Sequence, residues 1–170
     1  MKLFNLNTKT LIVVGVVMGL LFLGLALPRC HAAVLDAPYV QLSGGAAVVR
    51  GATEALDLTF TEPAPVLRNA YAQGSLTVLG TSTFRGASVP NNFAARALFV
   101  DGFGRFDVGL GLSWMQNPAP YNGSPINFNL QFAYRFIFLP VTLTYTHMSN
   151  AGSRLPNLGR DIVLLGWRFH

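Results

Sequence analysis

Three residues near the C-terminus have the side chains of a serine hydrolase triad. His31 lies beside the apolar N-terminal segment and His170 ends the chain, so His147 is the one internal imidazole available as a general base. Ser149 follows two residues later, and Asp161 twelve residues after that. A hydroxyl, an imidazole and an orienting carboxylate can hydrolyse an ester without metal or cofactor, so we expect neither here.

The two segments that carry these residues alternate as β-strands do. In 141–149, His147 and Ser149 share a face with Val141, Leu143 and Tyr145, while Thr142, Thr144 and Thr146 occupy the other. In 161–169, Asp161 shares a face with Val163, Leu165, Trp167 and Phe169. A hairpin centred near Arg154 would place Asp161 opposite His147, with Cβ atoms about 4.5–5.5 Å apart. The pattern therefore predicts that base, nucleophile and acid converge.

The same alternation recurs along the chain and predicts an all-β fold. Eight segments separated by Pro, Gly and Asn clusters are candidate strands: about 38–49, 54–62, 70–80, 93–102, 104–116, 126–137, 139–149 and 161–169. One face of each is apolar, but the other carries Gly, Ser, Thr and Asn in place of the Lys and Glu of a water-exposed face. Apolar residues facing lipid and small polar residues facing inward indicate an eight-stranded antiparallel outer-membrane β-barrel.

The N-terminus reads as a signal peptide over residues 1–32, followed by a barrel domain over 33–170. Lys2 and Lys9 precede the apolar run 11–27, and Cys30 and Ala32 form a small-x-small cleavage pattern. An uncleaved anchor is the alternative, since 17 apolar residues lie at the short limit for crossing a bilayer. Removal of the peptide, with Arg29, would lower the net charge from +5 to +2.

The remaining chain has no Lys, no Cys and no run of basic residues. Binding to nucleic acid is therefore disfavoured, and disulfides and thiolate metal sites are excluded. An eight-stranded barrel is filled by its own side chains, so a diffusion pore is also disfavoured. We expect four polar-face residues to form an internal charge network: Arg105, Asp107, Arg135 and Arg168.

Strand direction predicts where the candidate triad lies. With a periplasmic N-terminus, odd-numbered strands run outward, so the hairpin from the seventh strand to the eighth is extracellular. Ser149, His147 and Asp161 would then face the headgroup zone of the outer leaflet, where lipopolysaccharide supplies the ester bonds.

The run from His147 to Gly152 (HMSNAG), followed by Pro156 to Gly159 (PNLG) and Asp161, resembles the PagL-type lipid A 3-O-deacylase family. The resemblance implies hydrolysis of the acyl ester at the 3-position of lipid A. It makes Ser149 the nucleophile, His147 the base and Asp161 the orienting acid. It also implies oxyanion donors at the backbone amides of Asn150 and Gly152, with Asn157 shaping the site. The family usually has Glu in place of Asp161, a side chain longer by about 1.5 Å.

The alternative is a non-catalytic small barrel that serves in adhesion, structure or protein interaction. His-x-Ser is a weak motif, and Ser-Asn-Ala-Gly is ordinary turn chemistry. We expect Tyr145, Trp167 and Phe169 to face lipid, and Arg154 and Arg160 to be solvated loop charges, with contact to lipid phosphates as the other interpretation. The partners expected are lipid A and the outer membrane; the sequence leaves a monomer and a homodimer open.

Overall fold

The computed structural model describes residues 38–47, 53–64, 70–84, 87–118, 123–155 and 157–169. The predicted signal peptide and His170 lie outside the described residues. No helix within the described part of the chain is long and apolar enough to cross a membrane.

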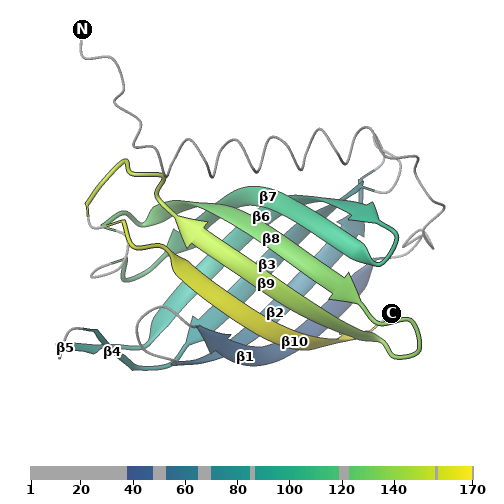
Figure 1. The fold of residues 1–170 in the computed structure, drawn as a ribbon, viewed down its shortest axis with the longest axis horizontal. Helices are drawn as coiled ribbons and strands as arrows, with labels where there is room; N and C mark the ends of the chain where they lie inside the picture. The colour runs from purple at the N-terminus through teal and green to yellow at the C-terminus, as the bar shows by residue number, and fades with distance from the viewer. Residues whose placement is uncertain are drawn as a thin grey trace, which may run out of the picture. The chain divides into compact units, whose positions relative to one another are not determined.

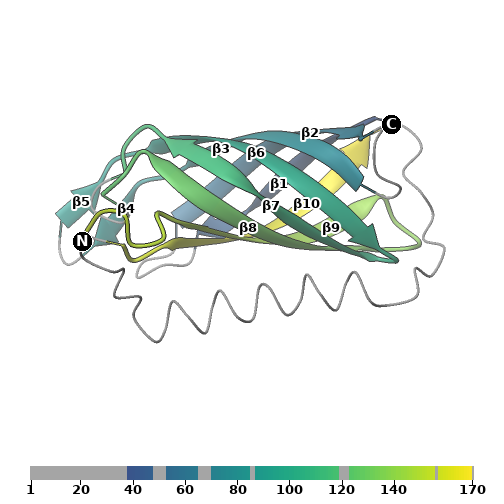
Figure 2. The same cartoon turned by 90° about the horizontal axis from the view of Figure 1, so that it is seen from above.

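The described strands form a closed antiparallel barrel (Figures 1 and 2). Around it the order is β1-β10-β9-β8-β7-β6-β3-β2, so each barrel strand pairs with the barrel strands before and after it in sequence, and β1 closes on β10. The bounds are β1 (Tyr39–Ala47), β2 (Thr53–Pro63), β3 (Ala70–Leu79), β6 (Asn92–Phe103), β7 (Phe106–Met115), β8 (Ile126–Arg135), β9 (Val141–Ser149) and β10 (Arg160–Phe169). This confirms the predicted eight-stranded barrel.

Two short strands, β4 (Ser82–Phe84) and β5 (Ala87–Val89), form a separate hairpin in the connection between β3 and β6. The sequence did not indicate this hairpin, because strands of three residues are too short to show alternation. Figure 1 shows it at the same end of the barrel as the connection from β9 to β10. The tight turns from β6 to β7 and from β8 to β9 lie at the opposite end.

Apolar side chains face outward and polar side chains face inward. In β8, Phe128 is 59% exposed, whereas its neighbours Asn127 and Asn129 are 1% and 2% exposed. Because the pattern repeats on the other strands, the outer wall is a continuous apolar surface of the kind that contacts lipid. Examples of outward residues are Leu42, Leu56, Phe60, Val78, Phe99, Leu112, Trp114, Leu143, Leu165 and Trp167.

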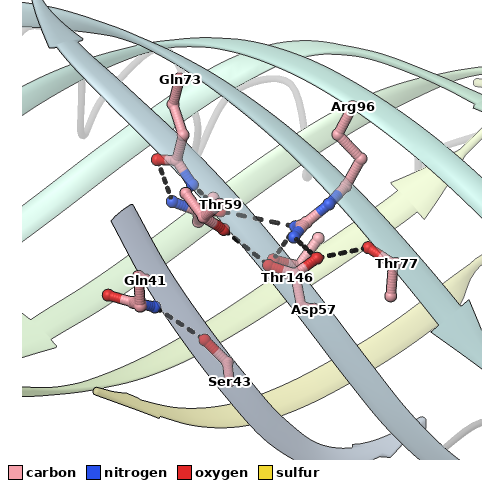
Figure 3. Close-up of polar contacts among 9 residues, drawn as sticks. Gln41, Ser43, Asp57, Thr59, Gln73, Thr77, Arg96 and Thr146 are labelled. Atoms are coloured by element: carbon pink, nitrogen blue, oxygen red, sulfur yellow. Dashed lines mark hydrogen bonds and ion pairs between the residues drawn. The ribbon is translucent and has the colours of Figure 1, made fainter. Parts of the chain in front are cut away.

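A buried ion pair anchors the polar network inside the barrel (Figure 3). Nη2 of Arg96 donates to Oδ1 of Asp57 at 2.6 Å, and both side chains are 1% exposed. The hydroxyls of Thr59 and Thr77 donate to the same carboxylate, and Nη1 of Arg96 donates to Thr146 Oγ1 at 2.9 Å. These contacts link β2, β3, β6 and β9 across the lumen, which supports a plugged interior.

The expected charge network is only partly present. Nη2 of Arg135 lies 3.0 Å from Oδ1 of Asp107, as an internal pair. Arg105, however, is exposed and donates to the hydroxyl of Tyr134 at 3.4 Å, so its placement in the lumen was wrong. The reason is that Gly104 and Arg105 form the two-residue turn between Phe103 and Phe106, where strand alternation stops.

Candidate active site

The predicted hairpin between β9 and β10 places the candidate acid opposite the candidate base. The register pairs Asp161 with His147, and Arg160 with Met148. Met148 and Arg160 point inward and are 0% and 2% exposed, so His147 and Asp161 alternate onto the outer face. The pair therefore lies on the outside of the barrel, where these two strands end and begin.

The imidazole and the carboxylate are hydrogen-bonded. Nδ1 of His147 lies 2.7 Å from Oδ1 of Asp161, and about a third of each side chain is exposed. With Asp161 ionised, Nδ1 of His147 donates, and the other ring nitrogen, Nε2, is left to accept a proton. This is the tautomer and orientation that a general base in a serine hydrolase requires.

Tyr145 makes a third contact at this site. From the sequence we expected Tyr145 to face lipid, and this contact was not predicted. Its hydroxyl donates to the same oxygen, Asp161 Oδ1, at 2.7 Å. The signal available in the sequence was position: Tyr145 is two residues before His147 on the same face, within diagonal reach of Asp161. The expected outward placement fits all three residues, with Tyr145, Trp167 and Phe169 37%, 47% and 51% exposed.

Ser149 is the last residue of β9 and lies on the same face as His147. It is half-buried, and Phe128 of β8 is its cross-strand partner. Among the described hydrogen bonds, none joins Ser149 to the imidazole.

A tight turn follows Ser149 and is organised by Asn150. Ala151 and Gly152 both have positive φ, 52° and 81°, and the Ser153 N–H donates to the Asn150 carbonyl at 3.0 Å, as in a type I′ turn. The side-chain oxygen of Asn150 accepts from the Gly152 N–H at 2.9 Å, and its Nδ2 donates to the Arg154 carbonyl at 2.7 Å. Asn150 itself is 1% exposed.

The three residues expected to shape the site or bind an oxyanion are thus in contact. The Asn150 N–H donates to Oδ1 of Asn157 at 3.2 Å, which ties the turn to the segment leading into β10. Both amides expected as oxyanion donors, those of Asn150 and Gly152, donate within the loop in this structure. For either amide to bind an oxyanion, its hydrogen bond within the loop would have to be exchanged.

Gly159 packs against the imidazole and was not singled out from the sequence. Its φ is +69°, and a Cβ added there would lie 2.6 Å from Cε1 and 3.2 Å from Nε2 of His147. A side chain at this position would therefore displace the ring. Glycine is required here both for the backbone conformation and for the space.

The two arginines near the site differ in exposure. Arg154 is exposed in the loop, as expected, but Arg160 is 2% exposed and points into the barrel. Arg160 is therefore neither a solvated loop charge nor placed to contact a lipid phosphate from outside. Within the described ranges, no three His, Cys, Asp or Glu side chains cluster as metal ligands would.

Comparison with known proteins identifies the family. The family model described as lipid A 3-O-deacylase (PagL) matches residues 69–170, more than half of the chain and all of the site described above. The chain belongs to the lipid A 3-O-deacylase family. This confirms the resemblance noted in the sequence.

A protein of known structure has a similar fold. That structure, titled "Crystal structure of the outer membrane enzyme PagL", aligns with a TM-score of 0.52 over 78% of this chain and 99% of the other, at 20% identity. No match was found among curated proteins. At the level of the family, this chain is an outer-membrane β-barrel hydrolase of the lipid A deacylase class.

Proposed function

We propose that this protein hydrolyses the acyl ester at the 3-position of lipid A, with Ser149 as nucleophile, His147 as general base and Asp161 as orienting acid. The observation that carries the proposal is the 2.7 Å contact between Nδ1 of His147 and Oδ1 of Asp161, on the same outer face as Ser149. In a family of ester hydrolases, this contact leaves Nε2 of His147 available to the serine hydroxyl.

The reaction proceeds in two steps. Ser149 Oγ forms a bond to the ester carbonyl carbon while its proton passes to Nε2 of His147. The bond from that carbon to the sugar oxygen then breaks, and the imidazolium returns the proton to the leaving oxygen, which becomes the 3-hydroxyl. A water molecule, deprotonated by His147, then attacks the acyl carbon. The bond from this carbon to Ser149 Oγ breaks, the imidazolium returns its proton to Oγ, and the acyl chain leaves as a fatty acid.

The tetrahedral intermediate needs donors for its oxygen, and the turn after Ser149 is the candidate source. The Gly152 N–H donates to Oδ1 of Asn150, and the Asn150 N–H donates to Oδ1 of Asn157. An exchange of one such bond for the oxyanion would supply the donor when the substrate is bound.

Access to the site also supports a lipid substrate. His147, Ser149 and Asp161 lie on the outer wall, whereas the lumen is crossed by the Arg96–Asp57 network. A substrate therefore approaches from the membrane, and the end of the barrel that carries the β9–β10 loop would lie at the outer leaflet. Residues 1–32 would serve as the signal peptide that directs export.

The test is to incubate purified, folded protein in detergent with lipid A that carries distinct acyl chains at each position. We expect release of one free fatty acid, and a product whose NMR spectrum shows a free hydroxyl at the 3-position of the sugar. Release from another position would contradict the 3-O assignment. Intact lipid A with folded protein would favour a non-catalytic barrel instead.

A further inference from the structure

The Tyr145 hydroxyl shares its acceptor with the candidate base. It donates to Oδ1 of Asp161 at 2.7 Å, and the same oxygen lies 2.7 Å from Nδ1 of His147. We infer that Tyr145 is a positioning residue, which fixes the Asp161 carboxylate so that this oxygen faces the imidazole. The inference rests on the proposed Ser149–His147–Asp161 triad and adds a fourth residue to it.

The Tyr145 ring is held on both sides, so its hydroxyl has a defined position. Its cross-strand partners are Phe132 on β8 and Val163 on β10. The rings of Tyr145 and Phe132 are stacked, with centroids 6.4 Å apart and an interplanar angle of 26°. A tyrosine has only two side-chain torsions, so packing of this kind fixes the hydroxyl at low entropic cost.

A polar group on this wall needs a partner. Away from His147 and Asp161, Tyr145 is surrounded by apolar side chains, among them Leu143 and Val163, which are 43% and 40% exposed. In an apolar environment an unpaired hydroxyl is costly, and so is a carboxylate with too few donors. The bond between Tyr145 and Asp161 satisfies both groups, and hydrogen bonds to an ionised acceptor are the stronger kind.

The position of Tyr145 complements that of His147. His147 is directly opposite Asp161, whereas Tyr145 is diagonal to it, two residues further from the β9–β10 loop. The two donors therefore reach the carboxylate oxygen from two successive outward positions of β9. Because both bonds end on Oδ1 of Asp161, rotation of the carboxylate about its Cβ–Cγ bond would lengthen both of them. Removal of the hydroxyl should leave that rotation restrained by His147 alone.

The test compares Tyr145→Phe with a matched control, Tyr134→Phe. Tyr145→Phe removes the hydroxyl and keeps the stacked ring. Tyr134 is also a tyrosine on the barrel wall, packed at 5.1 Å on Phe106, but its hydroxyl contacts Arg105 at the other end of the barrel. We expect Tyr145→Phe to lower kcat on lipid A about tenfold with KM unchanged, and Tyr134→Phe to match wild type.

A second measurement separates positioning from a general structural effect. The rate at which a fluorophosphonate labels Ser149 reports activation of the nucleophile without lipid A. We expect Tyr145→Phe to slow labelling by a similar factor, and to have no further effect when Asp161 is already Asn. This non-additivity follows because Tyr145 acts through the Asp161 carboxylate.

Either of two results would overturn the inference. One is that Tyr145→Phe has the labelling rate and turnover of Tyr134→Phe. The other is that Tyr145→Phe slows labelling as much in the Asp161→Asn protein as it does in the wild type. Failure of the proposed triad is recognised separately, in a Ser149→Ala arm. If folded Ser149→Ala still hydrolyses lipid A, the triad is wrong and the role of Tyr145 within it is overturned with it. If only the Tyr145 arm fails, the triad stands.

Discussion

Asp161 reaches the His147 imidazole even though its side chain is shorter than the glutamate usual in this family. The two residues are direct cross-strand partners on one face, which places their Cβ atoms at about 4.5–5.5 Å. The observed contact of 2.7 Å needs no longer side chain. Residue type and strand register therefore have to be considered together when the acid is assigned.

Asp161→Asn tests the orienting role. The amide keeps the size of the side chain but removes the charge that stabilises the imidazolium, and we expect a loss of about 10⁴ in kcat, the size of effect known for a comparable triad change in another enzyme. Asp161→Glu should retain activity. Turnover is measured on purified barrels whose folding is checked by gel mobility. Near-native turnover by Asp161→Asn would reduce the triad to a Ser149–His147 dyad.

The contacts of Tyr145 and Gly159 at this site were not predicted from the sequence, because they depend on how the strands and the loop are arranged in space. The types and spacing of His147, Ser149 and Asp161 could be read directly from the chain. The bond from Tyr145 depends on a diagonal contact across strands, and the contact of Gly159 with the imidazole depends on the path of the loop. The sequence showed only that Tyr145 shares a face with His147, and it carried no signal for the contact of Gly159 with the imidazole.

At the scale of elements, the loop between β9 and β10 forms one wall of the site. At the start of the loop, the Asn150 side chain accepts a hydrogen bond from the Gly152 N–H. At its end, Gly159 lies beside His147 in a backbone conformation that favours glycine. The loop therefore sets both the position of the imidazole and the backbone around Ser149. The effect of the loop on catalysis can be separated from its effect on stability by comparing a glycine substitution beside the imidazole with one at a distant turn.

Gly159→Ala should lower activity far more than it lowers stability. The new Cβ would meet the imidazole at 2.6 Å, so the ring must move away from Asp161 or Ser149. A misplacement of this order can reduce turnover about 10²-fold. The control is Gly104→Ala, where φ is +66° but a Cβ meets nothing within 4 Å. Both should lose about 1–2 kcal/mol of unfolding free energy from backbone strain, and only Gly159→Ala should lose activity.

Equal turnover in the two glycine variants would show that the contact with the imidazole has no catalytic consequence. The comparison is made on lipid A, with the free energy of unfolding obtained from urea titrations of the same samples. Stability thus serves as the internal reference for the activity difference.

Strand positions could be predicted to within a few residues, because two-residue alternation is strong where one face meets lipid. The bounds of β6 were also predicted, as 93–102, but which of its side chains face inward was not. Leu98 and Val100 face inward there, 5% and 0% exposed, and pack with Tyr71. Both faces of β6 (Asn92–Phe103) are therefore apolar in part. The alternation is blurred, and the inward position of Arg96 could not be recognised.

For the molecule as a whole, the buried Arg96–Asp57 pair couples strands far apart in sequence. Asp57→Ala should lower the free energy of unfolding by about 3–5 kcal/mol, because it leaves the Arg96 guanidinium buried without its counterion. Arg105→Gln, at an exposed arginine, should change it by less than about 1 kcal/mol. Urea unfolding followed by tryptophan fluorescence measures both. Equal small losses would mean that the lumen network contributes little to stability.

The closed barrel itself predicts a simple solution property. With β1 paired to β10, the sheet has no free edge, and such barrels resist detergent until heated. Unboiled and boiled samples should therefore migrate differently on a gel, for wild type and for Ser149→Ala alike. Identical migration, with a helical circular-dichroism spectrum, would contradict the fold.

The most direct test of the account is mass spectrometry of lipid A from cells that produce wild type or Ser149→Ala at equal levels of folded barrel. We predict that wild type removes one 3-hydroxyacyl chain from lipid A, and that Ser149→Ala leaves lipid A intact. Ser149 lies on the outer wall and takes no part in the lumen network, so the variant should fold normally. Intact lipid A in the wild-type cells, or deacylated lipid A with folded Ser149→Ala, would contradict the account.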